Sequence, residues 1–375
     1  MDFDFSDEQK QLRETARRFL AERCPMEAVR KVLDGEAAYD AGLWRALGEM
    51  GFLGAAIPEA HGGLGAGYLE LCVIAEEMGR SLAPVPMASS IYLAAEFLKA
   101  AGSEAQKATW LPKLASGEAV GAFALAEGPG RISASRIKAG VSGGKLTGTK
   151  LPVADGHVAD VAVVATKGAN GALSLYLVEL DGPGVERELL ESIDPTQGQA
   201  RLTFQGAAAE PLGAAGQGSQ IIAEVYDRAA VLLAFEQIGG AERALEMGRD
   251  YALERMAFGR QIGAFQAIKH MLADMYVSLA LARANAYYAA WALAAGAPQL
   301  KIAAPMARVS ATTAFQHCAK NNIQAHGGMG FTWAFDCHLY YRRSNGLAAV
   351  LGSLSTWQDL LISRMAELND LGAAA

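Results

Sequence analysis

The hydrophobic pattern of this 375-residue chain changes twice, and each change marks a different kind of secondary structure. Up to about residue 116, apolar residues recur at the spacing of an amphipathic helix, as at Leu12, Ala16 and Leu20. Between about 118 and 210 the apolar runs become short and alternating, and Gly, Asp and Asn bound them, which predicts strands. From about 218 onward long helical patterns return. The chain is therefore predicted to be α+β, with helical regions on both sides of a compact antiparallel β domain.

These patterns divide the chain into an N-terminal helical domain at 1–117, a β domain at 118–212 and a C-terminal helical domain at 213–375. Ser6, followed by Glu8 and Gln9, is typical of a helix start, whereas the glycine-rich segment 57–65 is expected to be a loop. The best-defined expected strands are 161–164, 173–180 and 201–204. The expected C-terminal helices are 219–256, 265–295, 299–325 and 346–368. Four helices with short connections predict an antiparallel bundle.

Composition limits the class of protein. About half the residues are apolar, as in a globular chain, and the net charge of −7 comes from interspersed signs, unlike a nucleic-acid-binding surface. The four cysteines have no Cys-x-x-Cys spacing, so we expect neither a metal site nor a disulfide framework, and a reducing compartment fits. The acidic segment 1–5 is unlike a signal peptide, and the apolar run 286–297 is too short to span a bilayer. We expect a soluble, cytoplasmic protein without nucleic-acid or membrane partners.

A short segment between two predicted helices concentrates groups that bind phosphate. Residues 255–266 run RMAFGRQIGAFQ, so Arg255, Arg260 and Gln266 fall within one loop that also contains Gly259 and Gly263. Arginine guanidinium groups match phosphate oxygens in bidentate geometry, and glycines let the backbone approach a ligand closely. For any single residue, a solvated turn between helices is the alternative. The complete spacing favours a phosphate-rich ligand.

This segment resembles the FAD-binding loop of the acyl-CoA dehydrogenase family, which contacts the pyrophosphate side of FAD on a neighbouring subunit. The resemblance extends along nearly the whole chain, through 5–9 (FSDEQ), 43–54 (LWRALGEMGFLG), 58–65 (PEAHGGLG), 75–80 (AEEMGR), 102–107 (GSEAQK) and 111–114 (LPKL). Residues 324–330, QAHGGMG, resemble the family's second FAD-contacting turn. A Gly-Gly-x-Gly run alone is common, but at this distance from the arginine loop it is a specific signal.

The resemblance implies the family's fold, which comprises an N-terminal helical domain, a middle antiparallel β-barrel-like domain and a C-terminal four-helix bundle. It implies FAD as cofactor, an acyl-CoA thioester as substrate and electron-transfer flavoprotein as electron acceptor. The positions that match FAD contacts of the family are Arg255, Phe258, Arg260, Phe265, Gln266, Gln324, His326, Gly327 and Gly328. No metal is implied.

The family places its catalytic base in two different positions. Many members carry it in a Tyr-Glu-Gly-Thr segment on the last helix, but here that region, 347–353, runs LAAVLGS without an acid. A minority has a glutamate beside an arginine early in the first bundle helix, where this chain has Asp227 and Arg228. The resemblance implies Asp227 as base and Arg228 on the CoA side; an acid placed where a helix start favours negative charge is the alternative. Glu236 is a rival base, but nine residues place it about 180° around the helix from Asp227, so both cannot share one site.

The segments that face the flavin ring in the family are altered here. The family's Thr-Glu-Pro-Gly-Ala-Gly-Ser-Asp corresponds to 126–133, AEGPGRIS, in which Ala126 lacks the hydroxyl. The family's Trp-Ile-Thr corresponds to Leu151-Pro152-Val153, which lacks both the aromatic ring and the hydroxyl. This part of the chain either still binds a cofactor or is an eroded site on a retained scaffold.

These departures, together with segments 155–160 and 239–243, resemble a subfamily of bacterial α2β2 acyl-CoA dehydrogenases, several of which act on steroid side chains and other bulky acyl groups. The first hypothesis is a subunit that forms a 2,3-enoyl-CoA, in such a heterotetramer or in a homotetramer. The second is a non-catalytic partner that completes the FAD sites of a homologous chain. The third is a relative that uses its base for other thioester or nitroalkane chemistry.

Overall fold

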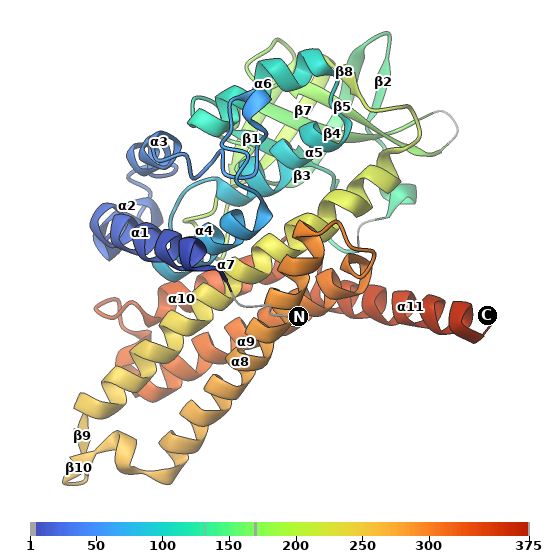
Figure 1. Ribbon diagram of the computed structural model, residues 1–375. Coiled ribbons are helices and arrows are strands. Elements are labelled where there is room, and N and C mark those ends of the chain that lie inside the picture. The colour runs from blue at the N-terminus through green and yellow to red at the C-terminus, as the bar shows by residue number, and fades with distance from the viewer. Residues whose placement is uncertain (1–4, 132, 169–170, 374–375) are drawn as a thin grey trace. The chain divides into compact units, whose positions relative to one another are not determined.

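The computed structural model describes residues 5–131, 133–168 and 171–373 (Figure 1). The predictions that involve residues 1–4, Ile132 and 374–375 fall outside this part. No helix in the described part is long and apolar enough to cross a membrane. The chain forms two compact units, one made of Met1–Glu27, Tyr68–Ala83 and Ala230–Ala375, and the other of Ala28–Gly67 and Pro84–Ala229.

The first unit is helical and draws its helices from three separate stretches of sequence. They are α1 (Asp7–Arg23), α4 (Tyr68–Ser81), the larger part of α7 (Gly218–Glu254), α8 (Gln266–Ala294), α9 (Leu300–His326), α10 (Cys337–Ala349) and α11 (Leu354–Ala373). The predicted helix start at Ser6 is confirmed, since its side chain and that of Gln9 form a reciprocal capping box. Helices α8 and α9 pack along each other, as do α9 and α10.

Helices α4 and α7 cross at glycines. A Cβ atom on Gly79 would lie 1.8 Å from the carbonyl oxygen of Glu236, and one on Gly239 would lie 1.8 Å from that of Glu76. These distances are far inside van der Waals contact with rigid backbone. The crossing therefore requires glycine at both positions.

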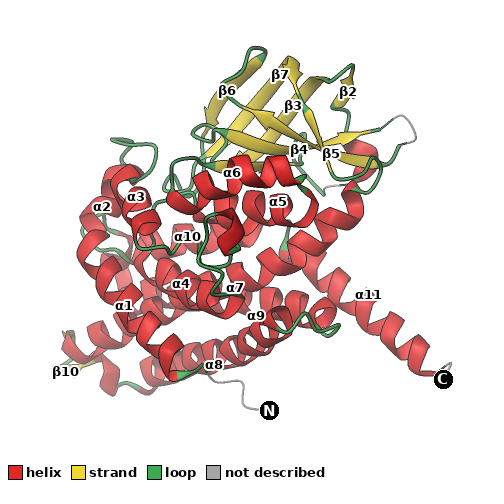
Figure 2. Ribbon diagram, turned by 45° about the horizontal axis from the view of Figure 1, so that its top comes forward, coloured by secondary structure: helices red, strands yellow, loops and turns green. Residues whose placement is uncertain are grey.

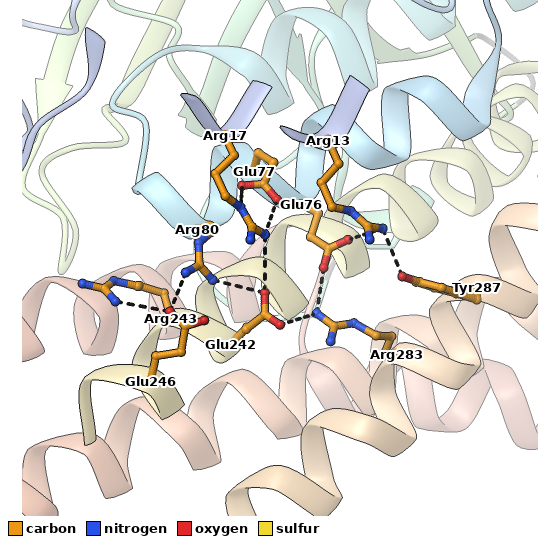
Figure 3. Close-up of polar contacts among 10 residues, drawn as sticks. All are labelled: Arg13, Arg17, Glu76, Glu77, Arg80, Glu242, Arg243, Glu246, Arg283 and Tyr287. Atoms are coloured by element: carbon orange, nitrogen blue, oxygen red, sulfur yellow. Dashed lines mark hydrogen bonds and ion pairs between the residues drawn. The ribbon is translucent and has the colours of Figure 1, made fainter. Parts of the chain in front are cut away.

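A network of charged side chains surrounds this crossing and joins α1, α4, α7 and α8 (Figure 3). At its centre, the buried carboxylate of Glu76 accepts hydrogen bonds from Arg283 at 2.7 Å and from Arg13 at 3.3 Å. Burial raises the pKa of Glu76, while the two guanidinium groups oppose this shift. A second buried carboxylate, Glu77, accepts from Arg17 at 2.7 Å. Because each buried acid has an arginine partner, the helices can pack closely around ionised groups.

The second unit combines short helices with two β-sheets. Its helical elements are most of α2 (Met26–Leu33), α3 (Ala41–Glu49), the 3-10 turn η1 (Glu59–His61), the π-helical η2 (Ala88–Ala95), α5 (Glu96–Ala101), α6 (Glu104–Ser116), the 3-10 turn η3 (Ala134–Arg136) and the start of α7. The glycine-rich segment predicted as a loop thus contains one 3-10 turn. Helix α6 begins with a Ser103–Gln106 capping box and ends at Gly117, which has a φ of 74°.

Each sheet has four strands, which Figure 2 shows in yellow. One sheet has the order β1 (Gly121–Ala124), β4 (Val161–Lys167), β5 (Leu173–Glu179), β8 (Glu210–Leu212). The other has the order β2 (Gly140–Ser142), β3 (Lys145–Ala154), β7 (Gln199–Ala208), β6 (Val185–Leu190). All pairs are antiparallel except β1 with β4, which the sequence pattern did not indicate. Among the described residues these sheets do not close into a barrel.

The strands expected at 161–164, 173–180 and 201–204 correspond to β4, β5 and β7, and the first three expected C-terminal helices correspond to α7, α8 and α9. The single helix expected at 346–368 is wrong. The chain breaks there between α10 and α11, where Leu351 and Gly352 have φ values of 63° and 102° and the Ser353 hydroxyl accepts the Thr356 amide hydrogen at 3.3 Å. The apolar periodicity continues through this break and concealed it. The boundaries of the three domains drawn from the sequence stay predictions.

Candidate functional site

The segment with two arginines folds as a β-hairpin at one end of α7 and α8 (Figure 1). Strand β9 (Met256–Ala257) pairs antiparallel with β10 (Arg260–Gln261). Both residues of the turn have positive φ, 52° at Phe258 and 78° at Gly259, which is the signature of a type I′ hairpin. The tight turn projects Phe258, whose side chain is 94% exposed.

The hairpin leads directly into the start of α8. After the 3-10 turn η4 (Ile262–Ala264), Phe265 occupies the N-cap position without a side-chain cap, and Gln266 begins the helix. The guanidinium carbon of Arg260 lies 4.2 Å from the centre of the Phe265 ring, and Phe258 meets the same ring edge-on at 6.1 Å. The cation–π contact orients an exposed arginine beside a helix N-terminus, an arrangement that attracts anions.

The second predicted FAD segment lies at the end of α9 and continues into the 3-10 helix η5 (Gly327–Phe331). His326 is buried, and its Nδ1 donates a hydrogen bond to the Asn322 carbonyl oxygen at 2.8 Å, since a carbonyl can only accept. Burial lowers the pKa of His326, and the bond to Asn322 opposes this shift. The imidazole is thus a neutral, oriented ring rather than an exposed cation.

Tyr251 brings the two segments to the same end of the bundle. Its ring stacks on His326 with centroids 4.1 Å apart, and its carbonyl oxygen accepts the Arg255 amide hydrogen at 2.8 Å. Of the nine predicted FAD residues, His326 is buried and Phe265 is half-buried. The other seven are exposed, namely Arg255, Phe258, Arg260, Gln266, Gln324, Gly327 and Gly328. A Cβ atom on Gly327 or Gly328 would meet nothing within 4 Å. We call this end of the bundle, residues 255–266 and 324–328, the cofactor end.

Asp227 and Arg228 lie in the part of α7 that belongs to the second unit. Asp227 is 7% exposed, so it is not the surface acid of the alternative interpretation. The Arg228 guanidinium lies 3.4 Å from a carboxylate oxygen of Glu96, which is buried at the start of α5. The other Glu96 oxygen accepts from Lys99 at 2.6 Å. Glu96 and Lys99 were not singled out from the sequence, because an acid and a lysine three residues apart are a common surface pair on helices.

Glu236, the rival base, belongs to the first unit. Its carboxylate is buried and lies 3.5 Å from the guanidinium of Arg343, which also donates to the Leu82 carbonyl oxygen at 3.2 Å. A buried carboxylate beside a buried arginine is typical of a structural ion pair. Glu236 is therefore a weaker candidate for the base than Asp227.

The acid-free segment 347–353 is held by hydrogen bonds to its backbone. Arg308 is fully buried on α9 and donates to the carbonyl oxygens of Leu347 and Val350, the latter at 2.7 Å. Burial lowers the pKa of Arg308 to about 10, which the Glu236 carboxylate opposes. Trp357 donates to the Leu351 carbonyl oxygen at 3.2 Å. The region in which many relatives carry a base is here a fixed turn with no acid.

Glu127, in the segment that corresponds to the flavin side, is held by other residues of the chain. The ammonium group of Lys150, which is fully buried, donates to Glu127 at 2.7 Å and to the Leu125 carbonyl oxygen at 3.0 Å. Glu127 also accepts the amide hydrogens of Lys138 and Ala139 at 2.7 and 2.9 Å. Burial alone would raise the pKa of Glu127, but the Lys150 and backbone hydrogen bonds lower it overall. We call the described residues of this region, 126–131 and 133–136, the β-domain loop.

Two family models match most of the chain. Residues 6–118 match the N-terminal domain of acyl-CoA dehydrogenases, and residues 216–365 match their C-terminal domain. The chain belongs to the acyl-CoA dehydrogenase family. The predicted membership and fold class are thereby confirmed, with helical regions at both ends and β-sheets in the middle.

Individual relatives cover nearly the whole chain. Acyl-CoA dehydrogenase IpdE2 of Mycobacterium tuberculosis is 35% identical over 92% of this chain and 94% of its own length. Acryloyl-CoA reductase (NADH) of Anaerotignum propionicum is 32% identical over 91% of this chain and 90% of its own. Among solved structures, a chain of the ChsE4–ChsE5 complex from Mycobacterium tuberculosis is 28% identical, with a TM-score of 0.89 over 98% of this chain and 99% of that one. The predicted enzyme class is confirmed, since this is a family of oxidoreductases that act on acyl-CoA thioesters.

The cofactor end and the region around the β-domain loop differ in how well their residues fit FAD. The cofactor end offers two arginines for the phosphates and open glycines that a flat ligand can approach. The β-domain loop and strand β3 offer Ala126 and Leu151, respectively, at positions that match hydroxyl and aromatic groups of the family. The residues present therefore fit the pyrophosphate side of FAD well and the flavin ring poorly.

Proposed function

We propose that this chain is a subunit of an FAD-dependent acyl-CoA dehydrogenase that converts an acyl-CoA thioester to its 2,3-enoyl-CoA. The observation that carries the proposal is the cofactor end, where the Tyr251–His326 stack gathers two FAD-type segments and leaves their polar side chains exposed. FAD, when bound, supplies an acceptor for the hydrogen that leaves the β carbon as hydride.

At the cofactor end, Arg255 and Arg260 bind the pyrophosphate, because a fork of N–H donors matches phosphate oxygens. The amides of Gln266 and Gln324 donate hydrogen bonds, and Phe258 and Phe265 provide apolar and aromatic contact. Gly327 and Gly328 allow the backbone to lie against the cofactor, and His326 fixes the turn through its stack on Tyr251. Since these side chains are exposed on this chain, they suit an FAD shared with a neighbouring subunit.

In the same proposal, Asp227 removes the α proton and Arg228 binds the CoA side of the substrate. Two observations support this role: Asp227 is 7% exposed, and it directly precedes Arg228 in α7. Aspartate is shorter than the glutamate of related enzymes, and a misplacement of about 1 Å can lower the rate roughly 100-fold. A slow or substrate-selective reaction is the expected result.

The partner of this chain is proposed to be a second acyl-CoA dehydrogenase-like subunit. The resemblance to the ChsE4–ChsE5 complex and the poor flavin fit of the β-domain loop both support an α2β2 assembly. A bulky acyl group such as a steroid side chain, electron-transfer flavoprotein as electron acceptor, and a cytoplasmic location complete the proposal.

A second candidate function is that of a non-catalytic subunit that completes the FAD sites of its partner. The observation in its favour is the lack of a hydroxyl or aromatic side chain at Ala126 and Leu151 together with the acid-free turn at 347–353. In this case Asp227 takes no part in the reaction, while the cofactor end keeps its role.

The two candidates are separated by expressing the chain alone and together with a homologous acyl-CoA dehydrogenase chain. If the chain is self-sufficient, it purifies with stoichiometric FAD, and the flavin absorbance bleaches when isovaleryl-CoA, octanoyl-CoA or a steroid side-chain acyl-CoA is added. If it is a partner subunit, it is colourless alone, gains flavin only in the complex, and Asp227→Asn leaves turnover of the complex unchanged. Flavin absent from every preparation would overturn both candidates. Mass analysis of the products separates dehydrogenation from other thioester or nitroalkane chemistry.

A further inference from the structure

The second unit buries a carboxylate between two cations, one of which directly follows the proposed base in the sequence. Glu96 is almost completely buried, and its two oxygens contact different partners, Lys99 at 2.6 Å and Arg228 at 3.4 Å. Lys99 is further fixed by the carbonyl oxygen of Ala56 at 2.8 Å. Arg228 follows Asp227 directly in α7.

The two cations differ in what remains accessible. The Lys99 side chain is 15% exposed and has two anchors, whereas the Arg228 side chain is 27% exposed and its guanidinium carries five N–H donors. A single contact with Glu96 leaves part of that guanidinium reachable by an incoming oxygen. A long arginine side chain otherwise samples many rotamers, so an ion pair with a buried, anchored carboxylate restricts its position before any ligand binds.

Glu96 itself is poorly placed to act on a substrate. Both of its oxygens face cations, so neither is available as a base for a carbon-bound proton. Glu96 is therefore suited to hold a neighbouring cation in place rather than to accept a proton from a substrate.

We infer that Glu96 is a positioning residue, which holds the Arg228 guanidinium in the orientation that binds the CoA portion of an acyl-CoA thioester. The inference rests on the proposed function, in which Arg228 contacts the substrate. It assigns the preorganised charge at this point to the Glu96–Arg228 pair, while Lys99 compensates the other oxygen of the buried carboxylate.

The test uses Glu96→Gln in the complex of this chain with its partner subunit. Glutamine keeps the shape and one acceptor but removes the charge that restrains Arg228. We expect about a 5- to 10-fold weaker Kd for octanoyl-CoA by calorimetry, and an equal rise in KM with kcat within about twofold, because binding rather than the chemical step is changed. Lys99→Gln is the matched control, since it also disturbs the buried carboxylate but leaves the Glu96–Arg228 pair intact. It lowers the melting temperature and leaves Kd within about twofold.

Equal Kd values for wild type and Glu96→Gln would overturn the inference, as would equal losses in both variants, which would indicate a merely structural role. A wild-type complex that does not bind octanoyl-CoA would also overturn it. Calorimetry requires no turnover, so a complex that binds octanoyl-CoA but never forms the enoyl product would contradict the proposed dehydrogenation and leave the inference about Glu96 supported.

Discussion

The cofactor end and the β-domain loop both correspond to FAD-contacting segments of the same family, yet the chain builds them in opposite ways. At the cofactor end, the backbone is fixed from within by the Tyr251–His326 stack, and the polar side chains extend into solvent. In the β-domain loop, several polar groups form hydrogen bonds within the chain itself. Lys150 binds Glu127, and Arg136 donates to the carbonyl oxygens of Pro129 and Arg131 at 2.8 and 3.2 Å. A region prepared for a ligand keeps its donors free for that ligand, whereas a region that supports itself uses them.

The largest effect is expected when the ion pair between Lys150 and Glu127 in the β-domain loop is removed. Lys150→Met leaves the carboxylate of Glu127, which is 10% exposed, without its cation. Breaking a buried pair in this way costs about 3–5 kcal/mol, so we expect the free energy of unfolding in urea to fall by that amount. The double variant with Glu127→Gln recovers part of the loss. A loss below about 1 kcal/mol would show that the loop does not depend on this pair.

At the cofactor end, Arg260→Ala is expected to leave the fold intact and weaken FAD binding. The lost charge-assisted hydrogen bonds are worth about 1.5–3 kcal/mol, which is about 10- to 100-fold in affinity. The measurement is FAD retention by the complex in a dilution series followed by flavin fluorescence. Lys145→Ala, an exposed cation at the start of β3, is the control and retains FAD like wild type. Equal retention in both variants would remove Arg260 from the proposed site.

Two glycine substitutions test whether FAD occupies the open space beside the turn at the cofactor end. A Cβ atom on Gly328 meets nothing within 4 Å, whereas one on Gly330 lies 2.7 Å from the Ile323 carbonyl oxygen. Gly328→Ala should therefore leave the free energy of unfolding unchanged but weaken FAD binding by about 1 kcal/mol through overpacking against the cofactor. Gly330→Ala should mainly destabilise the fold. If Gly328→Ala binds FAD normally, the cofactor does not lie against this turn.

The smallest expected effect is a pH dependence of the fold at the cofactor end. Burial holds the pKa of His326 below its usual value of 6.5, so the unfolded chain binds a proton at this residue more readily than the folded chain does. Its contribution to stability is complete above pH 6.5 and is lost as the pH falls through the lowered pKa of the folded state. His326→Phe retains a ring for the stack but cannot titrate. Urea unfolding between about pH 5 and 8 should show a shallower acid-side slope for this variant, by under about 1 kcal/mol in total. If the free energy of unfolding depends on pH equally in wild type and in His326→Phe, the lowered pKa of His326 does not contribute to this pH dependence.

The sequence predicted much of the fold because its signals are local. The capping residue Ser6 and the helices α7, α8 and α9 follow from short-range spacing. The spacing of residues 255–266 is equally local, and it was specific enough to indicate the family. The break at Leu351 was missed because a left-handed leucine has no sequence signature, and its turn is held by Arg308 and Trp357 from elsewhere in the chain.

The candidate site was less accessible to sequence reasoning because it depends on burial and on long-range contacts. Tyr251 joins the two FAD-type segments through a ring stack that periodicity cannot indicate. Asp227 and Glu236 are both acids on α7, and only the structure shows that Arg343 pairs with Glu236. Glu96 has the sequence context of a surface residue, yet its carboxylate lies buried between Lys99 and Arg228. In each case the residue that makes the important contact is either far away in the sequence or part of a helical pattern that does not distinguish buried from exposed side chains.

The glycine crossing of α4 and α7 bears on how chains of this family can be recombined. Because Gly79 and Gly239 each pack against the backbone of the other helix, the close approach of α7 depends on a glycine in α4 as well as on its own. A chimera that exchanges only Ala230–Ala375 with a homologue would combine most of a foreign α7 with the native α1 and α4, which supply Arg13, Arg17 and Arg80 to the charged network (Figure 3). The portable module of this protein is therefore discontinuous, and Met1–Glu27 and Tyr68–Ala83 have to be transplanted together with the C-terminal helices.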